Sequence, residues 1–346
     1  MKNNEVMEQF QFSGKKVDVY FDADFSSIEE NLKRDDLIYI TDENVYDAHR
    51  DKFSGKKIII IRAGERFKNQ QAVDFIIEQL IQLDADRDSW IVGVGGGVVT
   101  DIAGYVASIY MRGIKFGLVP TTILAMVDAS VGGKNGIDVG VYKNLVGVIN
   151  QPAFLLYDYS FLDSLIHDEW INGFAEIIKH SCIRDREMFE QLKNFSVKKF
   201  QSSAGDTAAI IRRNVNIKYR IVANDEFESG DRKLLNFGHT IGHAIENTTG
   251  LSHGKAISIG MHAACRISEV INNFSQQETR EVIDLLRQYE LPVSYLLDKD
   301  ETWKILLHDK KKAGNNMNFV VLDSIGHASV KSIRLDQLHN IFNSIE

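Results

Sequence analysis

Short runs of β-forming residues alternate with polar or amphipathic segments through the first half of the chain. A helical periodicity follows the third run, over residues 69–83, and the isoleucines at 58–61 form an unbroken apolar stretch. Such a stretch is typical of a parallel strand that is covered on both faces. Strands that alternate with helices predict a doubly wound parallel sheet. The predicted strands lie at residues 16–20, 37–41, 57–62, 90–94 and 153–157.

The second half of the chain has the periodicity of amphipathic helices instead. Between residues 316 and 333, a short apolar run and a turn with glycine predict a small hairpin ahead of a terminal helix. The predicted fold class is therefore α/β, with a Rossmann-like, parallel-sheet nucleotide-binding domain at 1–164 and a mainly α-helical domain at 165–346. The helices of the second domain are predicted at 168–183, 207–223, 233–247, 255–272 and 277–289.

The composition fits an ordinary globular protein of about two domains, because the chain has 346 residues, 44% of them apolar and 25% charged. The formal net charge is -8 and the pI is about 5.7. A net-acidic surface does not attract nucleic acid or an anionic membrane, and we expect neither as a partner. An anionic ligand must therefore meet a local cluster of cations.

The cysteines and the N-terminus predict a reducing, cytoplasmic environment. Cys182 and Cys265 are too few for a disulfide framework, and neither belongs to a CxxC pair. The first residues are polar and acidic and have no apolar core of the signal-peptide type. No uncharged run of about 18 residues occurs elsewhere, so we expect neither export nor a membrane span.

A glycine turn after the fourth predicted strand is the first chemical signal. The strand runs into Gly95, Gly96 and Gly97, and a helix begins close behind. Without side chains, such a turn brings backbone N–H groups and a helix N-terminus close to a pyrophosphate. The run lacks the GxGxxG spacing, so a simple tight turn remains the alternative. Polar residues at the ends of the second and third strands, where such sheets bind ligands or cap helices, are Asp42, Asn44, Glu65 and Lys68.

Polar chemistry is densest between residues 110 and 144. Small residues, one acid and several cations surround two glycine turns, a composition that predicts a pocket for a phosphorylated ligand. Loop cations in contact with solvent only are the alternative. The segments concerned are 110–113, 119–122, 127–136 and 143–144.

Histidines carry the strongest signal of the second half. His239 and His243 are four residues apart and so lie on one face of a helix, and His253 follows ten residues later. The helix predicted at 168–183 has Glu176 one turn before Lys179 and His180. A carboxylate with two or three imidazoles makes a site that suits zinc and leaves room for water or substrate.

Other interpretations of these histidines remain open. The pair could line a packed helix, and the carboxylate could form an ion pair at the surface. A metalloprotease is disfavoured, because its helix needs glutamate directly after the first histidine and Thr240 stands there. A metal that polarises a substrate alcohol or carbonyl fits better.

Taken together and in this order, seven runs resemble the 3-dehydroquinate synthase family over nearly the whole chain. The resemblance implies tightly bound NAD, one divalent metal ion, zinc or cobalt, and a homodimer. At three positions the chain departs from the usual pattern, with Thr100, Asn135 and Lys255. The runs lie at 95–99, 110–113, 119–122, 127–136, 173–179, 234–243 and 253–254.

The resemblance implies roles for individual residues. Glu176, His239 and His253 would be the metal ligands, and His243 would lie beside the substrate. Arg112 would reach the substrate phosphate across the dimer interface. The other implied substrate contacts are Asp128, Lys134, Asn144, Lys179, Lys218, Arg232, Asn236 and a lysine of the 309–311 segment, for which we select Lys311. The implied NAD contacts are Asp42, Asn44, Glu65, Lys68, Gly96, Gly97, Asp101, Thr121, Thr122 and Lys143.

The implied substrate is a phosphorylated keto acid, 3-deoxy-D-arabino-heptulosonate 7-phosphate. NAD would oxidise one ring alcohol, phosphate would leave by elimination, and hydride would then return. Ring opening and an intramolecular aldol closure would give 3-dehydroquinate, in the shikimate pathway to aromatic amino acids. The enzyme would be a phosphate-eliminating carbon–oxygen lyase with no net redox change.

Three other hypotheses remain at this stage. A related sugar-phosphate cyclase, such as 2-deoxy-scyllo-inosose synthase, would need other groups in place of the carboxylate contacts. A metal-dependent alcohol dehydrogenase would produce NADH, and Glu176 and the many cations disfavour it. A non-catalytic binding protein would have lost ligands or cations, and none is lost.

Overall fold

The computed structural model describes residues 6–34, 36–140, 142–296, 298–309 and 314–345. Grouped by their contacts, these residues form two compact units. The first unit holds the residues up to Glu169 together with Ala208–Phe227, and the second holds Trp170–Thr207 and the residues from Glu228 onward. The segment Ala208–Phe227 thus returns to the first unit. The domain boundary after residue 164 stays a prediction.

In the described part of the chain, seven strands form the sheet of the first unit, in the order β1-β2-β9-β6-β5-β3-β4. β1 pairs with β2 in antiparallel fashion, whereas the other neighbours pair in parallel. The predicted α/β fold class with a Rossmann-like parallel sheet is confirmed. The strands are β1 (Val6–Gln11), β2 (Lys16–Phe21), β3 (Leu37–Asp42), β4 (Lys57–Ile61), β5 (Trp90–Gly95), β6 (Lys115–Pro120) and β9 (Phe154–Leu156).

Burial varies across this sheet with the position of each strand. β3 and β5 lie inside the sheet, and nearly all their side chains are buried on both faces. β4 lies at an edge, where it pairs with β3 alone among the described strands, and Ile60 is 38% exposed. The prediction that the isoleucine run is covered on both faces is therefore wrong. An apolar run does not distinguish an edge strand from an inner one.

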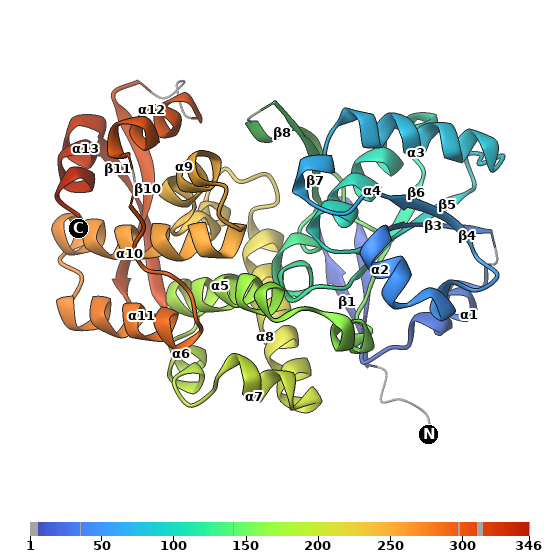
Figure 1. The fold of residues 1–346 in the computed structure, drawn as a ribbon, viewed down its shortest axis with the longest axis horizontal. Helices are drawn as coiled ribbons and strands as arrows, with labels where there is room; N and C mark the ends of the chain where they lie inside the picture. Colours follow the sequence, from blue (N-terminus) through green and yellow to red (C-terminus); the bar gives the residue numbers. More distant parts are fainter. Residues whose placement is uncertain (1–5, 35, 141, 297, 310–313, 346) are drawn as a thin grey trace. The chain divides into compact units, whose positions relative to one another are not determined.

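Helix α4 packs on the strands that lead into the glycine turn (Figure 1). A Cβ at Gly93 of β5 would lie 2.7 Å from the Cβ of Ala103, so glycine is what lets helix and strand approach. The helices of this unit are α1 (Ile28–Leu32), α2 (Glu43–Ala48), α3 (Gln70–Gln82), α4 (Gly97–Ile109) and the greater part of α8 (Ala204–Asn224). Shorter helical turns are η1 (Phe25–Ser27), η2 (Arg50–Phe53), η3 (Glu65–Phe67), η4 (Tyr110–Arg112), the π-helical η5 (Ala125–Ala129) and η6 (Tyr159–Ser164).

A hairpin that the sequence did not predict carries several of the candidate ligand contacts. β7 (Lys134–Val139) and β8 (Tyr142–Ile149) pair in antiparallel fashion. β8 has no simple alternation, because most of its side chains are exposed on both faces, including Leu145 at 62%. Without a buried face, no period-two pattern marks the strand.

The second unit is built around α10, which contacts α9, α11, α13 and β10 (Figure 1). The hairpin and terminal helix predicted here are present. The helix predicted from residue 233 begins at His239, because the preceding segment forms η7 (Asp231–Asn236) and Gly238 has a left-handed φ of 78°. The elements are α5 (His167–Arg184), α6 (Arg186–Leu192), α7 (Val197–Gln201), α9 (His239–Thr249), α10 (His253–Asn272), α11 (Gln276–Gln288), α12 (Lys299–Asp309), α13 (Leu335–Ser344), β10 (Asn316–Ser324) and β11 (His327–Arg334).

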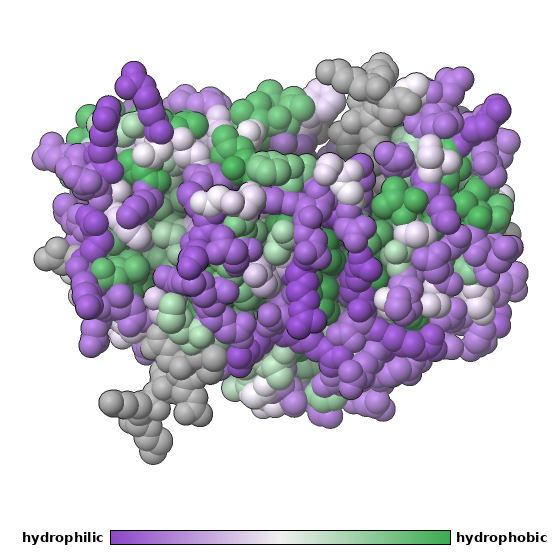
Figure 2. Space-filling view, turned by 180° about the vertical axis from the view of Figure 1, so that it is seen from behind, coloured by the Kyte–Doolittle hydropathy of each residue, from purple (hydrophilic) through white to green (hydrophobic). Residues whose placement is uncertain are grey.

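None of the described helices carries the apolar length that a bilayer crossing requires. On the face shown in Figure 2, hydrophilic side chains predominate and divide the apolar ones into small groups.

Candidate active site

Glycines bring α9 and α10 unusually close together. A Cβ at Gly260 of α10 would lie 2.1 Å from the carbonyl oxygen of Gly238 and 2.7 Å from the nitrogen of Gly242. Only a residue without a side chain fits there. Because His239 begins α9 and His253 begins α10, their rings come within 5.4 Å, measured between centroids.

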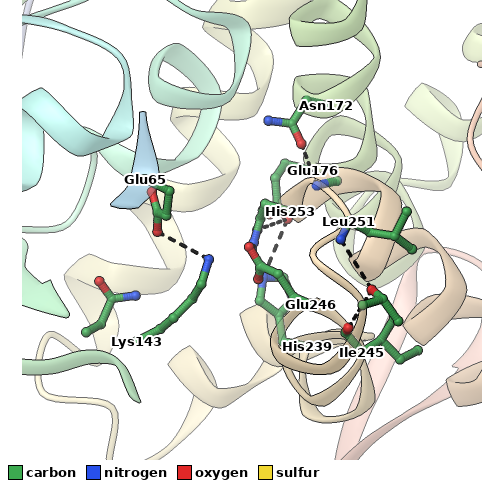
Figure 3. Close-up of polar contacts among 12 residues, drawn as sticks. Glu65, Lys143, Asn172, Glu176, His239, Ile245, Glu246, Leu251 and His253 are labelled. Atoms are coloured by element: carbon green, nitrogen blue, oxygen red, sulfur yellow. Dashed lines mark hydrogen bonds and ion pairs between the residues drawn. The ribbon is translucent and has the colours of Figure 1, made fainter. Parts of the chain in front are cut away.

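A second close approach sets α10 against α5. A Cβ at Gly254 would lie 2.3 Å from the carbonyl oxygen of Asn172, and the Gly254 N–H donates to Asn172 Oδ1 at 2.5 Å. Glu176 follows Asn172 by one helical turn on α5. The contact therefore fixes the start of α10, with His253, beside the Glu176 carboxylate (Figure 3).

These two packing contacts gather one carboxylate and two imidazoles. Nε2 of His239 and Nε2 of His253 each lie 3.5 Å from Oε1 of Glu176. One ligand atom from each of these residues lies within 4.8 Å of the others. Glu176 is fully buried, and Lys179, one turn further along α5, forms an ion pair with its carboxylate.

The other ring nitrogen of His239 shows how this imidazole is oriented. Nδ1 of His239 lies 3.1 Å from the carbonyl oxygen of Phe237, which can only accept a hydrogen bond, so Nδ1 carries the proton. The lone pair on Nε2 of His239 then faces the Glu176 oxygen. Neither His239 Nε2 nor Glu176 Oε1 then carries a proton, and the two atoms lie 3.5 Å apart, so a cation between them would stabilise the pair. The donor set fits a divalent metal of the zinc or cobalt kind.

The protonation states of the two histidines differ. Burial lowers the pKa of His239 well below its ordinary value, and the Lys179 ammonium lowers it further. Burial also lowers the pKa of His253, but the carboxylates of Glu176 and Glu246 outweigh it and raise the pKa to about 9. At neutral pH, His239 is a ready ligand, whereas a metal must displace a proton from His253.

His243 lies next to this group and also belongs to another. Its ring centroid is 5.1 Å from that of His239 and 6.0 Å from that of His253. With Glu246 and His253 it forms a second set whose ligand atoms lie within 4.8 Å of one another. The role of His243 beside the substrate stays a prediction.

η7 carries two further predicted substrate contacts of the second unit. Arg232 is buried, with 2% of its surface exposed. Asn236 Nδ2 donates to Glu228 Oε1 at 2.6 Å, and Glu228 has a left-handed φ of 60°. The Glu228 carboxylate thus orients the Asn236 amide.

In the first unit, the glycine turn leads into α4 as predicted. Gly96 is the N-cap of α4, and a Cβ there would lie 3.2 Å from Thr122 Cγ2. The Thr121 N–H donates to the Gly95 carbonyl at 3.0 Å and ties the end of β6 to the turn. Backbone N–H groups at this helix start suit a phosphate group.

Asp101 and Asn144 form a hydrogen-bond network around the buried Lys68. Lys68 Nζ lies 2.5 Å from Asp101 Oδ2 and 2.6 Å from Asn144 Oδ1. Burial lowers the pKa of Lys68, but Asp101 and Glu65 outweigh it, so the pKa lies above its ordinary value. Burial raises the pKa of Asp101 against the opposing effect of the Lys68 ammonium. We expect a Lys68 ammonium facing an Asp101 carboxylate, because the pKa of Lys68 is raised and the two groups lie at ion-pair distance.

Other predicted residues of the first unit form pairs or stand at the surface. Lys218 Nζ donates to the Asp128 carbonyl at 2.7 Å and lies 2.8 Å from its Oδ1. Lys143 Nζ lies 3.3 Å from Glu65 Oε1 (Figure 3). The exposed side chains include Asn44, Arg112 and Lys134.

Asp42 accepts a hydrogen bond from the Val45 N–H at 3.0 Å and caps α2, which was the alternative for this position. Lys311 lies outside the described residues.

The comparisons with known proteins cover both units. The model of the 3-dehydroquinate synthase N-terminal family matches residues 58–172, and the model of the C-terminal family matches residues 173–312. The chain belongs to the 3-dehydroquinate synthase family. The 3-dehydroquinate synthase of Leptospira interrogans is 37% identical over 325 residues, 90% of either chain. That of Campylobacter concisus is 39% identical over 285 residues, 81% of either chain.

A solved structure supports the fold. The crystal structure of a 2-deoxy-scyllo-inosose synthase complexed with carbaglucose-6-phosphate, NAD+ and Co2+ has a TM-score of 0.85 to this chain at 24% identity. The match covers 97% of this chain and 99% of that one. At this identity, the likeness shows the fold alone.

Two departures from the usual sequence of the synthase family have structural roles. Asn135 donates to the Gly133 carbonyl at 2.7 Å and to the Asn150 carbonyl at 2.9 Å. Its amide packs directly against Gly104, where an added Cβ would lie only 1.9 Å from Asn135 Oδ1. Thr100 is buried and donates to the Gly97 carbonyl at 3.1 Å.

Three residues that hold parts of the candidate site in place were missed from the sequence. Glu246 follows His239 by seven residues and His243 by three, so helical spacing alone could have placed it on the same face. Asn172 stands one turn before Glu176. Glu228 had no such signal, because it lies outside a helix and its partner Asn236 is eight residues away.

Gly260→Ala is expected to lower the free energy of unfolding by about 1–3 kcal/mol, because its Cβ collides with the backbone of α9. Urea unfolding followed by circular dichroism measures the change. Gly205→Ala is the matched control, since Gly205 lies in helix α8 and a Cβ added there would meet nothing within 4 Å. Equal stability of the Gly260 variant and the control would contradict the close helix crossing.

Proposed function

We propose that this member of the family is a 3-dehydroquinate synthase, which converts 3-deoxy-D-arabino-heptulosonate 7-phosphate into 3-dehydroquinate and phosphate. The group of Glu176, His239 and His253, of which the first two are buried, carries the proposal, because it suits a divalent metal in a chain of this family. The curated relatives named 3-dehydroquinate synthase support the same conclusion. Because its product is 3-dehydroquinate, the enzyme would act in the shikimate pathway to aromatic amino acids.

The first unit would hold NAD. The start of α4, with Gly96 and Gly97, would accept the pyrophosphate between backbone N–H groups. When bound, NAD would supply the hydride acceptor for oxidation of one ring alcohol and, as NADH, the hydride donor for later reduction of the resulting ketone. The remaining proposed contacts to NAD are Asp42, Asn44, Glu65, Lys68, Asp101, Thr121, Thr122 and Lys143.

The second unit would hold zinc or cobalt through Glu176, His239 and His253. When bound, the metal supplies a Lewis acid that lowers the pKa of the substrate alcohol. Lys179, buried against Glu176, brings a positive charge to the same place and would bind an anionic group of the substrate. His243 would orient phosphate or water beside it.

The substrate would bear a carboxylate and a phosphate, and the proposed contacts match this charge. Asp128 holds the Lys218 ammonium through two contacts, which fixes the direction of its remaining N–H donors. Arg232 can grip an oxyanion with two parallel hydrogen bonds. The leaving phosphate can itself take up the proton during elimination. The further proposed contacts are Lys134, Asn144, Asn236 and Lys311.

We also propose a homodimer in which Arg112 reaches the neighbouring site. Met111, Arg112 and Gly113 have successive positive φ values of 50°, 67° and 113°, which is costly for the two residues that have side chains. Such a turn presents the guanidinium at the surface. Exposed apolar side chains at Ile109 and Met111, and along β8, offer area that a second copy can cover. The cytoplasmic location stays a prediction; both cysteines are free and buried.

The purified protein, supplied with the heptulosonate phosphate, NAD and zinc, is expected to release one phosphate per substrate consumed without accumulation of NADH. Oxidation and reduction cancel in this reaction, so NAD is regenerated. A phosphate assay and NADH absorbance, read in parallel, measure both.

Glucose 6-phosphate and sedoheptulose 7-phosphate are the comparison substrates for this assay. Turnover of either of these sugars in preference to the heptulosonate would make the protein a related cyclase. NADH formed in proportion to substrate would make it a dehydrogenase.

A further inference from the structure

Each ring nitrogen of His253 faces a different carboxylate. Nε2 lies 3.5 Å from Glu176 Oε1, and Nδ1 lies 3.3 Å from Glu246 Oε2 (Figure 3). Glu246 projects from α9 and is buried, with 7% of its surface exposed. His239 differs, because its Nδ1 faces the neutral carbonyl of Phe237. Two candidate ligands of the same kind are therefore backed by groups of different charge.

A carboxylate behind a ligating imidazole has two physical effects. It accepts the N–H of the far ring nitrogen, which fixes the tautomer and aims the other nitrogen at the metal. It also makes the imidazole a stronger donor. Glu246 meets both conditions toward His253, since a carboxylate only accepts and the contact is to the nitrogen that faces away from Glu176.

The charges around the group give Glu246 a further role. The Glu176 carboxylate shares its charge with the buried Lys179 ammonium. A divalent cation beside this ion pair receives less electrostatic stabilisation from Glu176 than it would from an isolated carboxylate. Glu246 adds a second negative charge within the same buried region, behind the imidazole of His253. In α10, Lys255 stands two residues after His253, so the first turn of that helix supplies a cation and no acid.

A different role for Glu246 is as a ligand itself, because His243, Glu246 and His253 could also hold a cation. A second metal on Nδ1 of His253 would require that ring to lose both its protons while Nε2 binds the first metal. An imidazole backed by a carboxylate needs no such double deprotonation. The geometry favours orientation over ligation.

We propose that Glu246 is a positioning residue of the metal centre, which holds His253 with Nε2 toward the metal and supplies part of the compensating charge. This inference rests on the proposed function only in that a divalent metal binds Glu176, His239 and His253.

Zinc affinity of the full chain, measured with zinc alone against a chromophoric chelator, tests the inference. Glu246→Ala removes both the acceptor and the charge, and we expect its zinc Kd to rise by about 10- to 100-fold. Glu246→Gln keeps a neutral acceptor of nearly the same shape, and we expect a smaller rise. Because Glu246→Gln preserves the packing of α9, it also serves if the alanine variant does not fold.

Glu269→Gln is the matched control. Glu269 lies on α10, is partly buried and pairs with Arg266 at 3.2 Å, far along the helix from His253. We expect its zinc Kd to equal that of the unchanged protein. The absorption spectrum of the cobalt-loaded protein gives a second readout, which should change in both Glu246 variants and remain the same in Glu269→Gln.

Two outcomes would overturn the inference. The first is an unchanged Kd and cobalt spectrum in Glu246→Ala. The second is two zinc ions per chain in the unchanged protein and one in Glu246→Ala, which would make Glu246 a ligand of a second metal. His239→Ala separates this inference from the proposed function, because retention of zinc in that variant would reject the proposed ligand set, whereas the Glu246 variants test only the support of His253.

Discussion

Replacement of His239 by alanine is expected to abolish stoichiometric zinc binding and to lower kcat by about 10³-fold or more. His239 supplies one of the three donors, and its neutral imidazole is ready to bind at neutral pH. With Glu176 and His253 alone, zinc would keep too few protein ligands for a stable site. A Lewis acid contributes several kcal/mol to charge stabilisation, and about 4 kcal/mol corresponds to about 10³-fold in rate.

Zinc content after gel filtration and turnover of the heptulosonate phosphate together measure this effect. His339→Ala is a suitable control, because His339 stacks on Trp303 at 4.6 Å between ring centroids and belongs to no candidate metal group found in the described residues. It should keep both zinc and activity. Full zinc content in His239→Ala would reject His239 as a ligand, whatever the effect on activity.

Arg112→Ala is expected to lower kcat/KM by about 10²- to 10³-fold, the loss that follows when one donor to a developing oxyanion is removed. If Arg112 serves the neighbouring site, mixing this variant with His239→Ala restores activity. In a mixed dimer, one site combines the intact His239 of one chain with the intact Arg112 of the other. Random exchange of subunits should then recover about a quarter of the unmutated activity.

Activity after co-refolding or co-expression of the two variants measures the recovery. Arg50→Ala is the control for loss of an exposed arginine, since Arg50 is exposed and forms its ion pair with the equally exposed Asp47. It should be fully active alone. Absence of recovery from the mixture, with mixed dimers present by mass, would remove the support for a shared site.

The sequence predicted the parts of this protein that regular periodicity marks. Inner strands such as β3 and β5 are nearly all buried, and α11 buries residues such as Val282 and Leu286 at helical spacing, so their patterns match their burial. The spacing of His239 and His243 likewise placed both on one helix face. The chemistry of a carboxylate with imidazoles suggested that Glu176 joins these histidines, and the resemblance to the family then selected Glu176, His239 and His253 as the ligands.

Features that depend on tertiary contact were not predictable. β8 lacks a buried face, so nothing in its pattern separates it from a loop. The start of α9 at His239 is set by the left-handed Gly238, which lies inside a segment with continuous helical periodicity. The contact of Gly254 with Asn172 joins residues 82 positions apart, and only the folded chain reveals why glycine is required there.

The network around the buried Lys68 affects how the first unit can bind a ligand. Lys68 already donates to Asp101 and Asn144, so a ligand that reaches it must exchange one hydrogen bond for another. An exchange contributes little net free energy, because the bond that is lost offsets the one that is gained. A ligand that cannot replace the lost acceptor leaves a buried ammonium undersatisfied, which costs more than the exchange gains. We therefore expect this position to discriminate between nucleotides more than it increases the affinity for the correct one.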